Sequence, residues 1–468
     1  MSRTQSPPVG SGQRLVRLER TLLVVGVLAL GFNLRAAITS LPPVFPELQA
    51  SLGLSGATIS ILAATPVICF GVVSGFAAAL ARRAGEERVL LGAIIALTAG
   101  LIARGAAPGA LLFPGTILAS GAIAVMNVLL SSLIKRRWPE RAGFLIGLYI
   151  TSLSAGAIVG SLVSVPLWQD TGGSVALTLG WLAGPAALAI LLWLPQLSPG
   201  GTTPRTPPGS APDGKNRHRI GRGTRPSPGG TTPRTPRCQA DGERQAVSGG
   251  GDVVRGGVPG RVPVYRYRIT WYVTLFMGMQ SLLYYATLSW LPTMLRDRGE
   301  SAAGAGDLLA LMGVGNLAVS LLVPMAAQRM RSQVTLVVPT VLAVAGGLAA
   351  LLYAPLDGAV AWALILGAGQ NAALTLAIFF TAARAPHAAA AASLSSLAQA
   401  VGYLLASAGP LEVGLLHSVT GSWTAPVMVL FALSVVMLVS GILAARPGML
   451  PSVAETAKAQ AAEAEGNA

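Results

Sequence analysis

The sequence predicts an all-α membrane protein with twelve transmembrane helices, arranged as two six-helix bundles. Hydrophobic residues make up 52% of the 468 residues and charged residues only 11%, whereas a soluble chain carries roughly a quarter charged residues. The apolar residues gather in stretches of about 20, the length at which a helix spans a bilayer. These stretches are continuously apolar and do not alternate, which favours helices over a β-barrel.

Twelve apolar stretches follow one another, six before a long polar segment and six after it. The short gaps between them hold proline, glycine and most of the charge. Glycine is abundant, with 56 residues, as expected where membrane helices pack closely through small side chains. The predicted spans are residues 21–41, 56–80, 89–106, 111–134, 142–166, 174–195, 269–291, 306–327, 333–353, 359–383, 390–416 and 423–445.

The formal charge of +15 reflects membrane topology and does not indicate a nucleic-acid partner. With a cytoplasmic N-terminus, all but four of the 33 lysines and arginines fall in the tails, the polar segment and the loops on that same side. The exceptions are Arg35, inside the first span, and Arg104, Arg296 and Arg298, assigned to the opposite face. This bias follows the positive-inside rule. It predicts a multi-pass integral membrane protein with both termini in the cytoplasm.

The chain divides into five predicted regions: a cytoplasmic tail (1–20), an N-terminal bundle (21–196), a cytoplasmic low-complexity linker (197–265), a C-terminal bundle (266–446) and a second cytoplasmic tail (447–468). The linker repeats SPGGTTPRTP at 198–207 and 227–236, and such a composition builds no packed core. We expect a dispensable linker, the alternative being a loop that binds anionic lipid or a partner.

Neither cysteine is expected to form a disulfide or to act in catalysis. Cys69 falls inside a span and Cys238 in the linker. The first apolar run is too long for a signal peptide and lacks a cleavage site, so we expect it to be a retained helix.

Hydrogen-bonding side chains are few inside the spans, and spans 1, 4, 7 and 10 each carry an Asn or Gln. In a bundle of two similar halves these positions are equivalent and suit the lining of a central cavity. A buried amide can also merely tie two helices together, for roughly 1 kcal/mol. The residues concerned are Asn33, Arg35, Thr39, Asn127, Tyr149, Thr151, Ser152, Gln280, Tyr284, Tyr285, Asn316, Gln370, Asn371, Gln399 and Tyr403.

Arg35 is the least expected of these residues. A guanidinium stays protonated, so it cannot avoid the cost of burial by neutralising itself. At mid-depth that cost is at least about 2.5 kcal/mol. One interpretation is that Arg35 snorkels outward. The other is that it lies in a water-filled cavity and binds an anion or an electron-rich group, because its fork suits flat, delocalised anions. Aligning Pro42 with Pro292 places Arg35 at the position equivalent to Tyr285.

Acidic residues offer little for proton coupling. Within the spans only Glu412 is found, near the outer end of span 11. Glu412 therefore carries coupling, or the substrate carries its own proton, or transport is uncoupled; Glu412 is also a candidate counter-charge for Arg35. The three histidines lie away from mid-membrane, and the sequence holds no HExxH, paired cysteines or phosphate-binding loop. We therefore expect no enzyme, no cofactor and no metal site.

Five stretches together resemble a known family. They are NLRAAITSLPPVFPEL (33–48), GAIAVMNVLLSSLIKRRWPERAGFLIGLY (121–149), FMGMQSLLYYATLSWLPTML (276–295), GAGQNAALTLAIFF (367–380) and LSSLAQAVGYLLASAGPLEVGLLHSVTGSW (394–423). They resemble the cyanate/nitroimidazole permease branch of the major facilitator superfamily. The resemblance implies the major facilitator fold, alternating access between the bundles, a bacterial inner (plasma) membrane and a small solute, often anionic or aromatic.

The resemblance and the polar residues together give the expected substrate-binding set: Asn33, Arg35, Asn127, Tyr149, Gln280, Tyr284, Gln370, Asn371, Gln399 and Tyr403. Some positions depart from the family pattern. Arg82 stands where Asp is usual in the 2–3 loop, and Glu86 and Glu87 stand where basic residues are usual, so the role of that motif is not carried over. Ala36 replaces a common Pro, and Glu412 stands where an apolar residue is expected.

The function predicted first is therefore secondary active transport of a small solute, cyanate-like or nitroimidazole-like, with Arg35 as the charge clamp. The alternative is a multidrug or toxic-compound exporter of the same fold, whose Tyr, Trp and amide groups bind uncharged aromatics. A membrane-embedded enzyme or receptor is a third class, disfavoured by the missing catalytic set and the lack of a large extracellular domain. The expected partners are a small-molecule substrate, the lipid bilayer and, as a candidate coupling ion, the proton. We expect a monomer.

Overall fold

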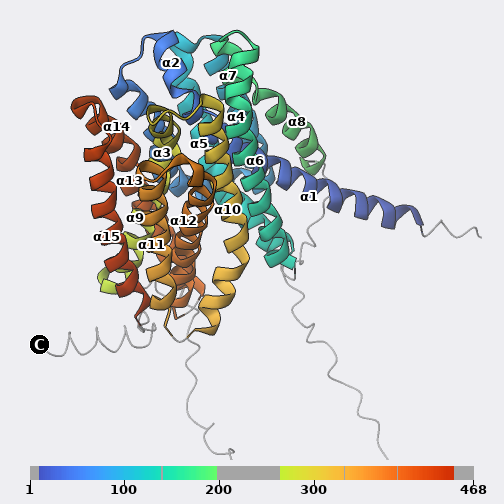
Figure 1. Cartoon of the computed structure of the whole chain (residues 1–468). Coiled ribbons are helices and arrows are strands. Elements are labelled where there is room, and N and C mark those ends of the chain that lie inside the picture. Colours follow the sequence, from blue (N-terminus) through green and yellow to red (C-terminus); the bar gives the residue numbers. More distant parts are fainter. Residues whose placement is uncertain (1–9, 139–140, 198–263, 331, 387, 447–468) are drawn as a thin grey trace, which may run out of the picture. The chain divides into compact units, whose positions relative to one another are not determined.

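The computed structural model describes residues 10–138, 141–197, 264–330, 332–386 and 388–446 (Figure 1). Every regular element in these ranges is helical, which confirms the predicted all-α class. The predictions made for most of the linker, for the C-terminal tail and for Cys238 lie outside the described residues.

The first half of the chain supplies six crossings. Its helices are α1 (Gly10–Thr39), α2 (Phe45–Leu52), α3 (Gly56–Ala84), α4 (Glu86–Ala106), α5 (Pro108–Arg137), α6 (Ala142–Asp170), α7 (Val175–Gly180) and α8 (Ala183–Trp193). The short 3-10 turns η1 (Pro42–Val44) and η3 (Leu194–Leu197) follow α1 and α8. The sixth predicted span is broken into α7 and α8. Pro185 explains the break, because its ring clashes with the carbonyl four residues earlier.

The second half repeats this plan with α9 (Arg268–Asp297), α10 (Ala302–Arg329), α11 (Val334–Tyr353), α12 (Ala359–Ala383), α13 (Ala388–Ala406), α14 (Ala408–Thr420) and α15 (Thr424–Ala445), together with η4 (Val264–Arg266) and η5 (Leu356–Gly358). Pro410 divides span 11 into α13 and α14 in the same way. Ten helical stretches among the described residues are long and apolar enough to cross a membrane. The long helices α9 and α10 complete the twelve.

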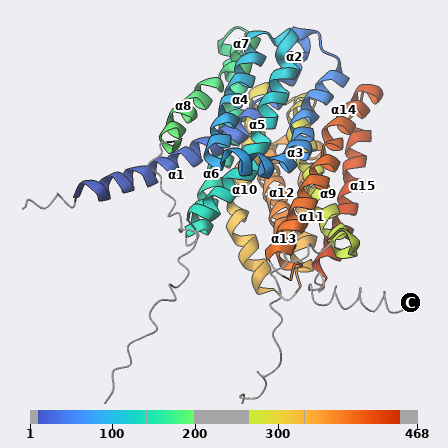
Figure 2. The ribbon, with the colours of Figure 1, turned by 180° about the vertical axis from the view of Figure 1, so that it is seen from behind.

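Helices of the two halves gather on opposite sides of the ribbon, blue to green against yellow to red (Figures 1 and 2). The halves meet where α3 packs on α13 and α14, and where α6 packs on α10. Large apolar side chains such as Phe76, Leu322 and Val435 remain exposed on the outside. Exposed apolar surface of this extent is expected where a protein faces lipid.

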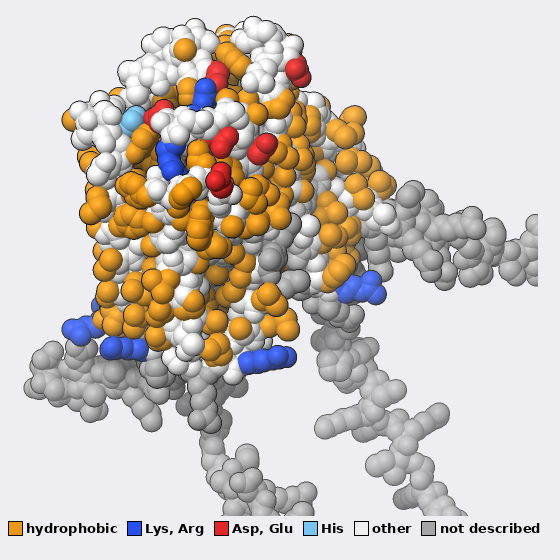
Figure 3. Space-filling view, viewed as in Figure 1, with side chains coloured by type: hydrophobic (Ala, Val, Ile, Leu, Met, Phe, Trp, Pro, Cys, Tyr) orange, Lys and Arg blue, Asp and Glu red, His pale blue; other side chains and the backbone are white. Residues whose placement is uncertain are grey.

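Charged side chains separate to the two ends of the bundle (Figure 3). Arginines and lysines from the ends of α3, α5 and α10 lie at one end, here called the basic end. Glu47, Asp170 and Asp307 belong to the other, here called the acidic end. The apolar band between them is the part that hydrocarbon would cover. Arg104 belongs to the acidic end but is only 2% exposed, and its Nε donates to the carbonyl of Leu179 at 3.0 Å.

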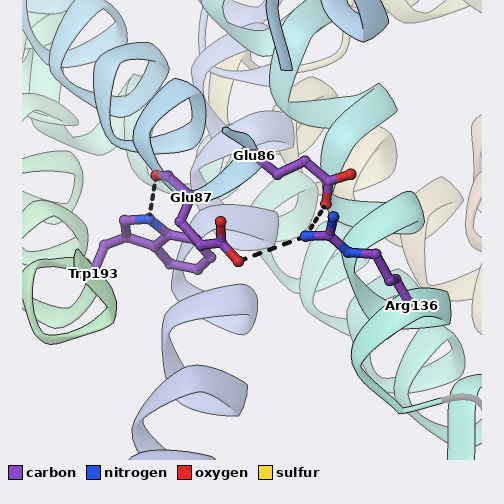
Figure 4. Close-up of polar contacts among 4 residues, drawn as sticks. All are labelled: Glu86, Glu87, Arg136 and Trp193. Atoms are coloured by element: carbon purple, nitrogen blue, oxygen red, sulfur yellow. Dashed lines mark hydrogen bonds and ion pairs between the residues drawn. The ribbon is translucent and has the colours of Figure 1, made fainter. Parts of the chain in front are cut away.

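The two glutamates that replace basic residues in the 2–3 loop form an ion-pair cluster at the basic end (Figure 4). Arg136 Nη2 lies 3.0 Å from Glu86 Oε2 and 3.6 Å from Glu87 Oε1, and Trp193 Nε1 donates to the carbonyl of Glu87 at 3.1 Å. Glu86 and Glu87 begin α4 and Arg136 ends α5, so each charge also suits its helix terminus. The cluster joins α4, α5 and α8 within the first half.

Small residues let α1 lie directly against α6. An added Cβ at Gly156 would collide with the carbonyl oxygen of Phe32, and one at Gly160 would lie 2.7 Å from that of Ala36. The contact is held by Thr39 Oγ1, which donates to the carbonyl of Ala157 at 3.0 Å. Gly156 and Gly160 thus form a small-xxx-small pair. They matter for the site because Arg35 lies on this stretch of α1.

Gly156→Ala is expected to destabilise the protein by about 1–3 kcal/mol, since the methyl group forces α1 away from α6. The measurement is the thermal midpoint of the purified protein in detergent. Gly147→Ala on the same helix is the matched control, because no atom lies within 4 Å of its added Cβ. Equal midpoints for the two variants would contradict the close α1–α6 contact.

Candidate substrate-binding cavity

A cavity lies between the two halves of the chain. Arg35 of the first half and helices of the second half line it. It holds about 400 Å³ of space free of atoms, a figure that includes space open to solvent. Arg35 comes from α1, and α9, α10, α12 and α13 supply the rest. The lining residues are Arg35, Gln280, Ser281, Tyr284, Tyr285, Asn316, Gln370, Asn371, Leu374 and Tyr403. Among these described residues, Arg35 alone carries a formal charge.

Arg35 is half-buried and faces tyrosines, not acids. Its Nη1 donates to the hydroxyl of Tyr284 at 3.1 Å, and its Cζ lies 5.2 Å from the centre of that ring. Tyr285 and Tyr403 line the same cavity. In the part of the chain that the structure describes, no carboxylate forms an ion pair with it. Its charge is therefore balanced only by dipoles, ring faces and whatever enters the cavity.

Aromatic rings form one wall of the cavity. The ring centres of Tyr284 and Tyr285 are 5.1 Å apart and those of Tyr285 and Tyr403 are 6.5 Å apart, with edge-on geometry. Phe70 of α3 packs behind the last two, with its centre 6.2 Å from Tyr285 and 5.9 Å from Tyr403. Edge-to-face packing of this kind fixes the rings. The wall therefore presents rigid, flat surfaces beside the guanidinium.

Amides from α10 and α12 also line the cavity. Gln370 is only 3% exposed, yet neither its Nε2 nor its Oε1 has a hydrogen-bond partner within the described residues. The Oδ1 of Asn316 is buried and unpartnered as well. Asn371 is held differently, since its Nδ2 donates to the backbone carbonyl of Asn316 at 2.7 Å. Buried polar atoms without partners call for water or a ligand.

The structure gathers six of the ten expected substrate-binding residues in this cavity: Arg35, Gln280, Tyr284, Gln370, Asn371 and Tyr403. The other four do not line it and have partners of their own. Asn33 donates to the carbonyls of Ala29 and Pro185, Tyr149 donates to Asn127 Oδ1 at 3.3 Å, and Gln399 donates to Ser395 Oγ at 2.9 Å. Glu412 lies on α14, outside the cavity lining, and forms no ion pair with Arg35.

Four lining residues were not in the expected set. Tyr285 and Asn316 are polar residues inside spans, and Tyr285 occupies the position equivalent to Arg35 in the other half, so that alignment did hold a signal for it. Ser281 accepts a hydrogen bond from Gln280 Nε2 at 2.6 Å. A serine and the apolar Leu374 carry no signal in a membrane span, because both are common packing residues there.

The two halves are in close contact at the acidic end. Arg296 of α9 lies 2.7 Å from Glu47 of α2, and the rings of Phe45 and Trp290 are 6.1 Å apart. An added Cβ at Gly56 of α3 would lie 3.3 Å from the Cβ of Ser418 on α14. A second hollow of about 310 Å³, mostly apolar, lies between α1, α3 and α9 and shares Tyr285 with the cavity. The acidic end is thus the closed side of this structure.

Comparison with known proteins extends the resemblance over most of the chain. The family model for the Major Facilitator Superfamily matches residues 23–410. The chain is 32% identical over 427 residues to the 2-nitroimidazole transporter of Escherichia coli (strain K12). The alignment covers 91% of this chain and 96% of that protein. It is 26% identical over 403 residues to the cyanate transport protein CynX of the same organism, covering 86% and 91%.

The crystal structure of a D-xylose–proton symporter has the same fold, with a TM-score of 0.64 at 14% identity over 92% of this chain and 96% of that one. At this identity the match concerns the fold alone. Because the family model covers most of the chain and the relatives match nearly end to end, the chain belongs to the major facilitator superfamily, in its cyanate/nitroimidazole permease branch, and is a membrane transporter of small solutes.

Proposed function

We propose that the protein moves a small monoanion with a flat, electron-rich group by alternating access, with Arg35 as its charge clamp. The observation that carries this proposal is the isolation of Arg35 in a cavity whose described lining holds no other charge. Burial of the guanidinium costs at least about 2.5 kcal/mol at mid-depth. Tyrosine dipoles offset part of that cost, and a bound anion offsets more, because charge-assisted hydrogen bonds are the strongest available.

The named substrates of the relatives agree with this chemistry. Cyanate is a small monoanion, and 2-nitroimidazole is a flat ring whose two nitro oxygens carry partial negative charge. Both suit a guanidinium fork flanked by aromatic faces. The rigid ring wall formed by Tyr284, Tyr285 and Tyr403 favours flat substrates over spherical ones. The same wall is the observation in favour of the second candidate, export of uncharged aromatic compounds.

Alternating access requires a closed side, and the contacts between Glu47 and Arg296 and between α3 and α14 supply one at the acidic end. We place the basic end in the cytoplasm on the positive-inside rule, and the membrane as a bacterial inner membrane on the family resemblance. In this arrangement the acidic end faces outward and must open once in each transport cycle.

Transport is expected to be electrogenic. The cavity lining has no carboxylate among its described residues to carry a proton, so a monoanion moves one net negative charge. The test uses purified protein in liposomes with a potassium gradient and valinomycin, and labelled benzoate as the anion. An inside-positive potential of about 100 mV corresponds to about 2.3 kcal/mol per charge and to ~50-fold accumulation.

Accumulation that ignores the membrane potential but follows a pH gradient would show that a proton accompanies the anion, by way of Glu412 or of the substrate itself. Transport of a neutral aromatic, with benzoate excluded, would favour the second candidate function. Protein-free liposomes measure the passive leak of benzoic acid, which must be subtracted in every arm.

A further inference from the structure

We propose that the substrate is two-ended: an anionic group that binds Arg35, and a second, neutral group that both donates and accepts hydrogen bonds and binds Gln370. This inference rests on the proposed function and adds the chemistry of the substrate's other end. A small aromatic anion with a hydroxyl or ring N–H away from its charge has this character. Gln370 then becomes the residue that determines specificity.

The argument begins with the amide of Gln370. Its side chain is 97% buried, lines the cavity and has no protein partner at either end, among the residues described. A glutamine that joins two helices would hydrogen-bond to a residue of the neighbouring helix. Asn371, the next residue, shows that alternative through its bond to the Asn316 backbone.

The unpartnered atoms determine which hydrogen-bonding groups a substrate must present. Gln370 Oε1 and Asn316 Oδ1 are each able to accept a hydrogen bond, and Gln370 Nε2 is able to donate one. When no substrate is bound, water supplies these hydrogen bonds. A substrate that displaces this water without replacing its hydrogen bonds binds more weakly. The amide end of the cavity therefore selects a group that donates and accepts together, and rejects an apolar edge.

The two ends lie on different halves of the chain. Arg35 is on α1 of the first half, whereas Gln370 and Asn316 are on α12 and α10 of the second. A two-ended substrate thus touches both halves at once and stabilises the arrangement in which they enclose it. A one-ended anion satisfies Arg35 only.

The test compares binding of benzoate with that of 2-, 3- and 4-hydroxybenzoate to the purified full-length protein, by isothermal titration. We expect at least one hydroxybenzoate to bind ~10-fold more tightly than benzoate, the effect of one well-placed hydrogen bond. In Gln370→Leu that preference should fall to within about 2-fold. Thr381→Val is the control on the same helix, because its hydroxyl bonds only within α12.

A stability readout separates recognition from structure. Because the Gln370 amide bonds to no described protein atom, Gln370→Leu should raise the thermal midpoint of the empty protein. A lowered midpoint would assign Gln370 a structural role and overturn the inference. So would anion binding that depends on Arg35 but shows no hydroxyl preference, or a preference that persists in Gln370→Leu. If benzoate does not bind, or binds equally to Arg35→Gln, the proposed function itself fails.

Discussion

Replacing Arg35 by glutamine should reduce anion transport by ~100-fold or more while the protein still inserts and folds. A charged fork holding an anion contributes about 3 kcal/mol through charge-assisted hydrogen bonds, which corresponds to ~150-fold. Glutamine is cheaper to bury than a guanidinium and can still hydrogen-bond Tyr284. Transport of labelled benzoate in liposomes at matched protein density measures the effect.

Arg35→Lys should restore only part of the activity, because an ammonium lacks the planar fork and stacks less well on Tyr284. Arg88→Gln is the matched control, since Arg88 is an exposed arginine at the start of α4, away from the cavity. Wild-type transport in Arg35→Gln would end the clamp hypothesis. The hypothesis that Glu412 is the counter-charge of Arg35 has its own test: if the two pair in any state, Glu412→Gln alone destabilises the protein and the double variant recovers.

Composition and pattern were enough to predict the fold, because a bilayer leaves few ways to satisfy a backbone. Continuous apolar runs of span length require helices, and the short loops carry their charge on one side. The interruptions at Pro185 and Pro410 were less visible, since prolines such as Pro66 and Pro166 lie inside α3 and α6 without dividing them. Whether a proline breaks a membrane helix depends on how neighbouring helices satisfy the freed carbonyl.

The site was harder to predict than the fold. Arg35 could be singled out from the free-energy cost of its burial alone, because a permanent charge inside a span must be offset by some interaction. An amide such as Gln399 cannot be singled out in this way, because one nearby hydroxyl is enough to bond it. Sequence reports which spans carry amides but not which way each side chain points along 3.6 residues per turn. Gln370 points into the cavity and Gln399 does not, and this difference is seen only in the three-dimensional arrangement.

The close contact of the two halves at the acidic end provides a place for a disulfide crosslink between α3 and α14. Outward opening must separate α3 from α14, which belong to different halves and meet near Gly56 and Ser418. A Cβ built on Gly56 lies 3.3 Å from the Cβ of Ser418, close to the ~3.5–4.5 Å of a disulfide. The double variant Gly56→Cys, Ser418→Cys should therefore crosslink, in a background where Cys69→Ala and Cys238→Ser remove the native thiols.

Oxidation of this double variant should lower transport to the level of protein-free liposomes, and dithiothreitol should restore it. Each single-cysteine variant should transport normally under both conditions, which controls for oxidation elsewhere. The crosslinked protein should still bind benzoate, because the disulfide lies at the acidic end and leaves Arg35 and the rest of the cavity unchanged. Binding without transport would locate the block in the conformational cycle. Undiminished transport by fully crosslinked protein would instead mean that α3 and α14 stay together throughout the cycle, and alternating access by their separation would have to be abandoned.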